Sequence, residues 1–150
     1  MAMKRSYETI DALPDALPVF PLASALVLPR GQLPLNVFEP RYVSMVDDAL
    51  RSNRLIGMIQ PDERAFAAGA APALHKVGCA GRITQLAETS DGRYVVTLTG
   101  VARFDISEEL QVTTPYRQCA VSFIRFADDL NPASDYGVDR ESVLRTLRLF

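Results

Sequence analysis

Residues 77–106 decide the fold, and their sequence is VGCAGRITQLAETSDGRYVVTLTGVARFDI. Apolar side chains recur there with a period of about two in Val77–Leu86 and again in Tyr94–Thr99, which is typical of strands buried on one face. The polar stretch between these segments ends in Asp91 and Gly92, a pair that readily adopts the positive backbone angles of a tight turn. The sequence therefore predicts two antiparallel strands joined as a hairpin.

More strands flank the hairpin. Gly100 predicts a bulge, the alternation resumes in Val101–Ile106, and another strand begins near Tyr116. Upstream, Leu55–Gln60 is a short apolar run that stops before Pro61, which indicates a buried strand. Several short strands at this spacing favour a closed or half-closed barrel over a layered sheet with helices on both faces.

The segment before residue 40 is punctuated by proline. Six of the ten prolines lie between Pro14 and Pro40, and each lacks a backbone N–H and disfavours helix in the residue before it. We therefore expect extended pieces at residues 19–22, 25–28 and 33–38. The prolines place part of this region at a sheet edge or a bulge.

Residues 40–52 are predicted to form an amphipathic helix with proline at its first position and Asn53 as a stop. Its apolar stripe consists of Tyr42, Met45, Val46, Ala49 and Leu50. The acidic neighbours Asp47 and Asp48 are expected to be solvated, because adjacent residues do not face each other on a helix. Residues 62–72 are rich in Ala and Gly without periodicity and are expected to form an exposed loop.

Three segments are expected along the chain. Residues 1–13 are predicted to be a flexible tail, residues 14–127 a β pseudo-barrel domain, and residues 128–150 a linker and the start of a helical part. Asp139 is suited to cap that last helix, whose apolar pattern continues through residues 149–150. We therefore expect a natural chain that extends further, and this helix is a candidate surface for homo-oligomerisation.

Composition places the chain among globular proteins of one domain. It has 150 residues, 48% hydrophobic and 23% charged, with a net charge of −2 from 16 basic and 18 acidic residues, which gives no general attraction to nucleic acid or anionic lipid. The longest uncharged stretch, residues 16–29, is too short to span a bilayer. Cys79 and Cys119 belong to no metal or redox motif and are expected to be reduced core thiols. A cytoplasmic location is the simplest expectation.

Catalytic motifs are absent from the sequence. It contains no P-loop, no G-x-S-x-G elbow and no H-E-x-x-H, and its one histidine, His75, cannot supply a metal site alone. We expect a protein that is not an enzyme and that carries no cofactor and no metal.

Ordered sequence blocks carry a family resemblance. They lie at residues 17–22, 28–31, 33–42, 56–58, 77–83, 91–94, 99–104 and 115–116. In this order and at this spacing, over Leu17–Phe126, the chain resembles the N-terminal substrate-binding domain of Lon proteases. Any one block is weak, whereas the ordered set is specific.

The resemblance implies a mainly β, α+β fold: a PUA-like pseudo-barrel of mixed strands with one inserted helix and a C-terminal helix. In full-length Lon enzymes this domain precedes an ATPase module and a Ser/Lys protease module and helps to recognise unfolded or tagged substrates. The chain resembles a stand-alone bacterial Lon-domain protein, shortened at its C-terminus. The implied function is non-catalytic binding of protein or peptide, with unfolded or extended polypeptides as partners.

Candidate peptide-binding residues lie around the proline-rich segment: Leu33, Leu35, Phe38, Glu39 and Arg41. An exposed sheet edge there would accept an extended peptide, and neighbouring pockets would take alternate side chains. The competing interpretation is structural. It places Leu35 and Phe38 in the core, and Glu39 at the positive end of the helix dipole.

The alternative function is RNA binding, because PUA-like folds often hold RNA. Five arginines of the β region would form a phosphate-binding face if they converged: Arg82, Arg93, Arg103, Arg117 and Arg125. The acidic net charge and the absence of tryptophan argue against this alternative.

Overall fold

The computed structural model describes residues 7, 9–66 and 72–131. Its strands are β1 (Ala16–Pro21), β2 (Gln32–Val37), β3 (Leu55–Ile59), β4 (Pro61–Phe66), β5 (Pro72–Leu74), β6 (Val77–Glu88), β7 (Tyr94–Glu109) and β8 (Gln118–Ser122). Its helices are α1 (Pro40–Leu50) and two 3-10 segments, η1 (Ile10–Ala12) and η3 (Ile124–Leu130).

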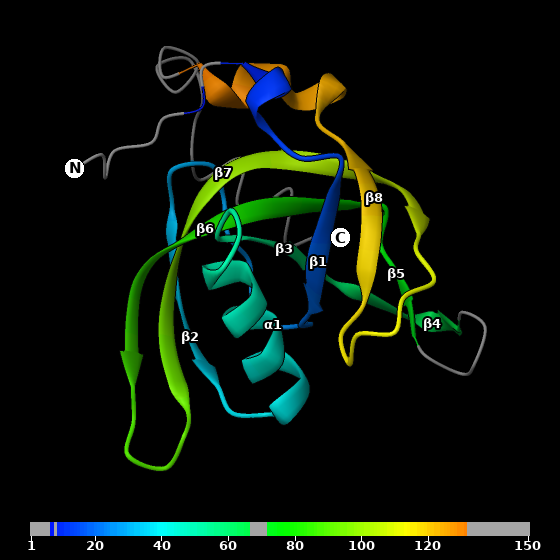
Figure 1. Cartoon of the computed structure of the whole chain (residues 1–150). Coiled ribbons are helices and arrows are strands. Elements are labelled where there is room, and N and C mark those ends of the chain that lie inside the picture. The colour runs from blue at the N-terminus through cyan, green and yellow to red at the C-terminus, as the bar shows by residue number, and fades with distance from the viewer. Residues whose placement is uncertain (1–6, 8, 67–71, 132–150) are drawn as a thin grey trace.

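The main sheet closes on itself. Its strand order is β2-β7-β6-β3-β1-β8, and β8 pairs again with β7, so the strands from β7 to β8 form a ring to which β2 is attached outside (Figure 1). β1 and β3 run parallel, whereas the other pairs are antiparallel. The predicted mainly β, α+β pseudo-barrel of mixed strands with an inserted helix is confirmed.

β7 connects the parts of the sheet. Residues 94–99 pair with β2, whereas residues 105–109 pair with β8, and β6 accompanies nearly the whole length of β7. The predicted hairpin is confirmed, with Gly92 at a φ of 84° in its turn. The predicted bulge is also confirmed, because the register between β6 and β7 leaves Val101 without a counterpart.

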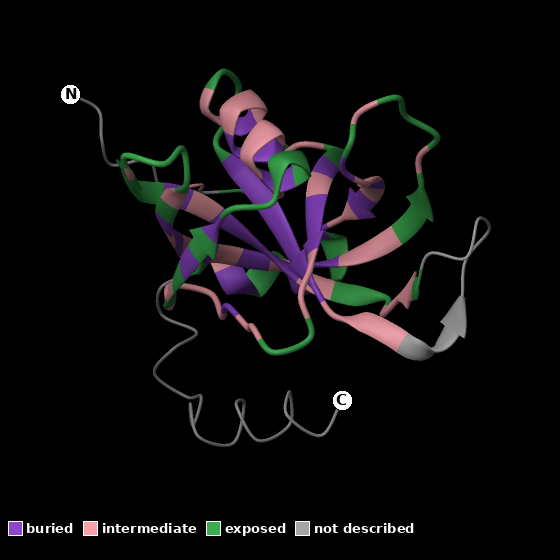
Figure 2. Cartoon of the chain, turned by 90° about the horizontal axis from the view of Figure 1, so that it is seen from below, coloured by how far each residue is buried: buried purple, intermediate pink, exposed green. Residues whose placement is uncertain are grey.

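Two hydrophobic clusters fill the fold, and β3 separates them. The helix-side core contains Met45 and Val46 of α1 together with Ile56 and Met58 of β3. The barrel core surrounds Phe104, and β3 contributes Leu55 and Ile59 to it from its opposite face. Every residue of β3 is therefore buried, and Figure 2 shows buried strand segments crossing the middle of the domain.

Local predictions for the helix are confirmed except at its end. The buried residues of α1 are Tyr42, Met45, Val46 and Ala49, as the apolar stripe predicts. The left-handed residue after the helix is Arg54, with a φ of 64°, and not Asn53. The Arg54 N–H donates to the Ala49 carbonyl at 2.9 Å, while the Asn53 side chain accepts from the Leu55 N–H.

Other segments differ from the prediction. The expected loop at residues 62–72 overlaps most of β4 and the first residue of β5, and these two strands form a separate two-stranded sheet. Such a ribbon does not require alternating burial, so periodicity could not reveal it. The predicted linker from residue 128 begins inside η3. At the other end, Leu13 is buried in the barrel core although it lies in the predicted tail. The helix predicted after Asp139 lies outside the described residues.

Gly100 is required by a close approach of the chain to β7. The Arg30 N–H donates to the Gly100 carbonyl, and the Gly100 N–H donates to the Gly31 carbonyl, both at 2.8 Å. A Cβ atom on residue 100 would lie 1.9 Å from the carbonyl oxygen of Leu28, closer than any nonbonded contact allows. Glycine therefore lets the loop at residues 28–31 bond to β7 directly after the segment that pairs with β2.

We expect Gly100→Ala to lower the free energy of unfolding by about 1 to 3 kcal/mol, because the added methyl group forces backbone away from backbone. Gly31→Ala in the same loop is the matched control, since its Cβ would lie 3.2 Å from the same carbonyl oxygen and requires only a small adjustment. Urea denaturation of both variants measures the difference. Equal stability of the two variants would show that the approach is not constrained.

Candidate functional site

An open groove runs along β2, the strand at the open end of the sheet. Residues 22–26 form one wall and Leu33–Asn36 form the other, with Gln60 also in the lining, and the volume is about 730 Å³. Four consecutive residues of β2 line the groove, so it follows the edge of this strand and not one of its faces. In the part of the chain that the structure describes, none of the lining residues is charged. The groove therefore presents apolar and uncharged polar groups beside a strand edge.

The free edge of β2 is defined by the hydrogen bonds of Gly100. These bonds point the polar backbone groups of residue 100 toward the β2 side of β7. Since backbone groups alternate in direction along an antiparallel ladder, Leu98 and Val96 point the same way, and their partners Leu33 and Leu35 face β7. The backbone groups of the intervening residues face away from the sheet; these residues are Gln32, Pro34 and Asn36.

Two of the predicted binding residues lie at this groove. Leu33 is half-buried and Leu35 is buried, and both line the groove while packing on the helix-side core. The structure thus supports both interpretations of Leu35, since the same side chain belongs to the core and to the groove wall.

The other three predicted residues do not line the groove. Phe38 is 60% exposed, so the core interpretation of Phe38 is wrong. The inward residues of β2 are odd-numbered, and Phe38 therefore continues on the outward side, where the Arg93 guanidinium lies 5.8 Å from its ring centroid. Glu39 and Arg41 form an exposed ion pair of 3.0 Å at the start of α1. The Glu39 side chain makes no capping hydrogen bond.

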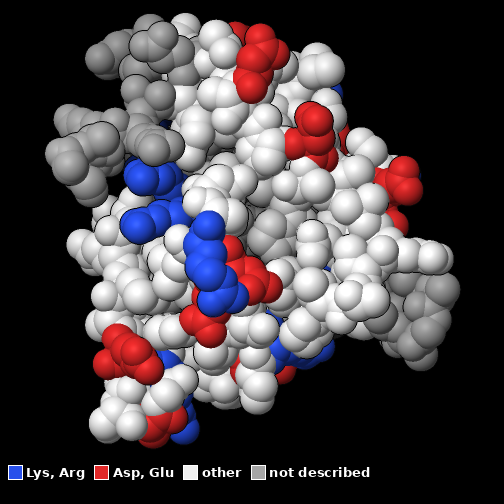
Figure 3. Space-filling view, viewed as in Figure 1, with Lys and Arg blue, Asp and Glu red and all other residues white. Residues whose placement is uncertain are grey.

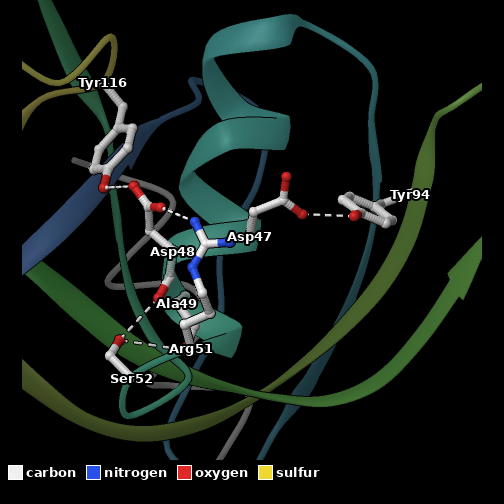
Figure 4. A network of polar contacts seen from close by, with 7 residues as sticks. All are labelled: Asp47, Asp48, Ala49, Arg51, Ser52, Tyr94 and Tyr116. Carbon is white, nitrogen blue, oxygen red and sulfur yellow. Dashed lines mark hydrogen bonds and ion pairs between the residues drawn. The ribbon is translucent and has the colours of Figure 1, made fainter.

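Two tyrosines clamp α1 against the sheet. The Tyr94 hydroxyl donates to Oδ1 of Asp47 at 2.6 Å, and the Tyr116 hydroxyl donates to Oδ2 of Asp48 at 2.5 Å (Figure 4). The expectation that this acidic pair is merely solvated is therefore wrong. Tyr94 lies opposite the last residue of β2, so the clamp fixes α1 to the end of the strand that forms the groove.

Comparison with known proteins gives the family. The model of the ATP-dependent protease La (LON) substrate-binding domain matches residues 16–148. The chain belongs to this family. Lon protease 2 of Myxococcus xanthus is 29% identical over 114 residues, which are 76% of this chain and 14% of that protein. The Lon protease of Syntrophus aciditrophicus is 30% identical over 118 residues, which are 77% of this chain and 15% of that protein. The chain thus spans a small part of the proteases that it matches.

Solved structures of Lon N-terminal domains share the fold. The Lon N-terminal domain protein from Xanthomonas campestris aligns with a TM-score of 0.56 at 29% identity, over 72% of this chain and 59% of that one. The N-terminal domain of the Mycobacterium avium complex Lon protease aligns with a TM-score of 0.57, over 72% of this chain and 54% of that one. The latter pair is 16% identical and shows the fold alone.

The arginines of this Lon-type domain do not form a free basic face. Four of the five predicted for RNA binding are paired with carboxylates: Arg93 with Asp91, Arg103 with Asp129, Arg117 with Glu109, and Arg125 with Asp105. Figure 3 shows basic and acidic groups beside each other on one face. Because each of these guanidinium groups already has a carboxylate, the structure does not support a phosphate-binding surface.

The cysteines are buried and free, as predicted. Burial raises the pKa of the Cys79 thiol to about 12 and that of the Cys119 thiol to about 11, so both thiols are protonated at neutral pH and are poor nucleophiles. Within residues 7, 9–66 and 72–131, no group of three or more His, Cys, Asp or Glu side chains is placed to hold a metal ion. Among the same residues, no helix has the length and apolar character needed to cross a bilayer.

The tyrosine clamp makes stability depend on alkaline pH. Burial and the Asp48 carboxylate raise the pKa of Tyr116 from 10.0 to about 12. A group whose pKa is higher in the folded state contributes stability fully below the unfolded pKa and loses it as the pH rises through the folded pKa. The contribution of Tyr116 is therefore present below about pH 10 and declines between about pH 10 and 12.

We expect Tyr116→Phe to lower stability at pH 7 by roughly 1 to 2 kcal/mol, because it removes a hydrogen bond to a charged acceptor. Between pH 10 and 12, the free energy of unfolding should fall less steeply in this variant than in the wild type, because the phenol no longer titrates. Urea denaturation across this pH range measures both effects. Parallel pH profiles would contradict a raised pKa at Tyr116.

Proposed function

We propose that this Lon-type domain is a non-catalytic recognition module that binds extended segments of unfolded polypeptides along the free edge of β2. Family membership supports a substrate-recognition role. The observation that carries the proposal is made on the described residues: β2 has an unpaired edge, and an uncharged groove follows the same residues, Leu33–Asn36. A cytoplasmic setting belongs to the same proposal.

Strand addition supplies the backbone part of the binding. An extended client segment beside β2 exchanges hydrogen bonds with the outward N–H and C=O groups of Gln32 and Asn36, and its N–H also donates to the Pro34 carbonyl. These bonds do not depend on client side chains, so they suit a module that must recognise many sequences.

The groove supplies the side-chain part of the binding. Alternate side chains of the client enter between β2 and residues 22–26, where Leu22, Ala25, Leu26 and Leu33 provide apolar surface. A charged side chain entering this groove would lose hydration without gaining a charged partner from the lining. Apolar segments, which unfolded proteins expose and folded proteins bury, therefore bind best.

Substitutions at Asn36 test the edge directly. Asn36→Pro removes an outward N–H without touching the ladder to β7, and we expect it to weaken binding by roughly two- to tenfold, the equivalent of one hydrogen bond. Asn36→Ala retains the N–H and is the matched control, with nearly unchanged affinity. The measurement is fluorescence anisotropy with labelled, reduced and carboxymethylated α-lactalbumin as the unfolded ligand.

Two further readouts complete this test. Thermal unfolding by circular dichroism must show that both variants fold. Equal affinity of the two variants would reject the β2 edge as the binding site, and no binding by the wild type would reject the function itself. Binding of RNA that falls steeply with salt concentration would favour the alternative function.

A further inference from the structure

A free strand edge is complementary to a second copy of itself. Two β2 strands can align antiparallel across a twofold axis, since each presents the same outward groups. Within the described residues, β2 has no neighbouring strand on one side and no charged side chain, and its register with β7 is unbroken from Gln32 to Val37. Charge, bulges and a covering strand, which commonly protect such edges, are therefore not used here.

We propose that Pro34 keeps a second copy of this chain from pairing with the free edge of β2, and so reserves the edge for other polypeptides. Pro34 lies midway between Gln32 and Asn36, the other two residues whose backbone groups face outward. The missing N–H of proline therefore falls at the centre of the edge, where it interrupts every alignment that pairs more than one outward residue of each copy.

The hydrogen bonds of the symmetric alignment show the effect. With the twofold axis at residue 34, Gln32 of each copy faces Asn36 of the other, and Pro34 faces its own counterpart. An ordinary residue pair at the axis would exchange two N–H···O bonds. With proline in both copies neither bond forms, because each carbonyl oxygen faces a proline nitrogen that has no hydrogen to donate.

Shifted alignments are also weakened. Moving one strand by two residues places Pro34 of each copy opposite Gln32 or Asn36 of the other. Each of those pairs loses one of its two bonds, and the overlap between the strands becomes shorter. No alignment that includes Pro34 therefore has a complete set of bonds.

A different polypeptide is less affected than a second copy. Its residue opposite Pro34 still donates an N–H to the Pro34 carbonyl, so one bond of that pair remains. The selectivity between client and second copy rests on the proposed function, whereas the block on self-pairing follows from β2 alone. The two parts fail separately, because oligomeric state can be measured without any client.

The test restores the missing backbone N–H at residue 34 and then removes the backbone N–H at residue 36. We expect Pro34→Thr to associate through β2, with a dimer dissociation constant roughly ten- to hundredfold below that of the wild type, because two central bonds become available. The double variant Pro34→Thr with Asn36→Pro should return to the wild-type state, since the edge again lacks one donor. Sedimentation velocity over a series of protein concentrations measures the assembly state.

Asn36→Thr is the matched control for strand propensity. It adds a β-branched side chain to the same edge but leaves Pro34 in place, and it should assemble no further than the wild type. Pro34→Gln provides a second donor-restoring variant with a different side chain. Circular dichroism shows which of the two donor-restoring variants is folded, and the assembly state of a folded variant is then compared with that of the wild type and of Asn36→Thr.

Three results would overturn the proposal. The first is that folded Pro34→Thr and Pro34→Gln assemble no further than the wild type. The second is that Asn36→Thr associates as strongly as they do. The third is that adding Asn36→Pro leaves the association of Pro34→Thr unchanged, which would place the new contact away from the β2 edge. Failure of the wild type to bind unfolded α-lactalbumin would reject the proposed function. It would not affect the conclusion that Pro34 blocks self-pairing of β2.

Discussion

The whole arrangement depends on β7 serving two neighbours along one edge. Its first residues pair with β2 and its last residues pair with β8, so the ring closes at one end of the strand while β2 remains outside the ring at the other. Between them the loop at residues 28–31 bonds to Gly100. If a side chain at residue 100 displaced this loop, the groove wall at residues 22–26 would lose its anchor at that end.

The groove follows from this constraint. Because β2 pairs only with β7 among the strands that the structure describes, its other edge faces the segment that the Gly100 contact holds nearby. The tyrosine clamp adds a second anchor, since Tyr94 lies opposite the end of β2 and bonds to α1. The free edge is therefore held on a rigid support at both ends, which reduces the entropy lost when an extended ligand binds.

The sequence predicted the elements that have a periodic signal. The hairpin, the buried strand β3 and the stripe of α1 all follow from alternation or from a helical period, and tertiary packing agrees with them. The pair β4 and β5 gave no signal, because a two-stranded ribbon outside the main sheet need not alternate. The core interpretation of Phe38 is wrong because the inward residues of β2 are odd-numbered, so the alternation carries residue 38 to the outward side, and hydrophobicity alone does not show this.

The contacts that involve distant residues could not be predicted from one sequence. Asp47 and Tyr94 are 47 residues apart, and Asp48 and Tyr116 are 68 residues apart, so only the folded chain brings them together. The arginines are a similar case. Their number in the β region suggested a basic face, but the carboxylate that neutralises Arg103, Asp129, is contributed by η3 after the last strand. The sequence shows how many charged residues are present, whereas phosphate binding depends on which of them have no partner in the fold.

The effect of proline in β2 depends on whether its position faces β7 or faces away from the sheet. At position 33 or 35 the same ring would remove a hydrogen bond to β7 and loosen the strand from the sheet. At position 34 the missing N–H faces outward, so the ladder to β7 is intact and the loss falls entirely on whatever approaches the edge. A second copy brings the same defect to the contact and a client does not. In this proposal, the edge discriminates between a client and a second copy because Pro34 occupies an outward-facing position. Proline at that position removes no hydrogen bond between β2 and β7.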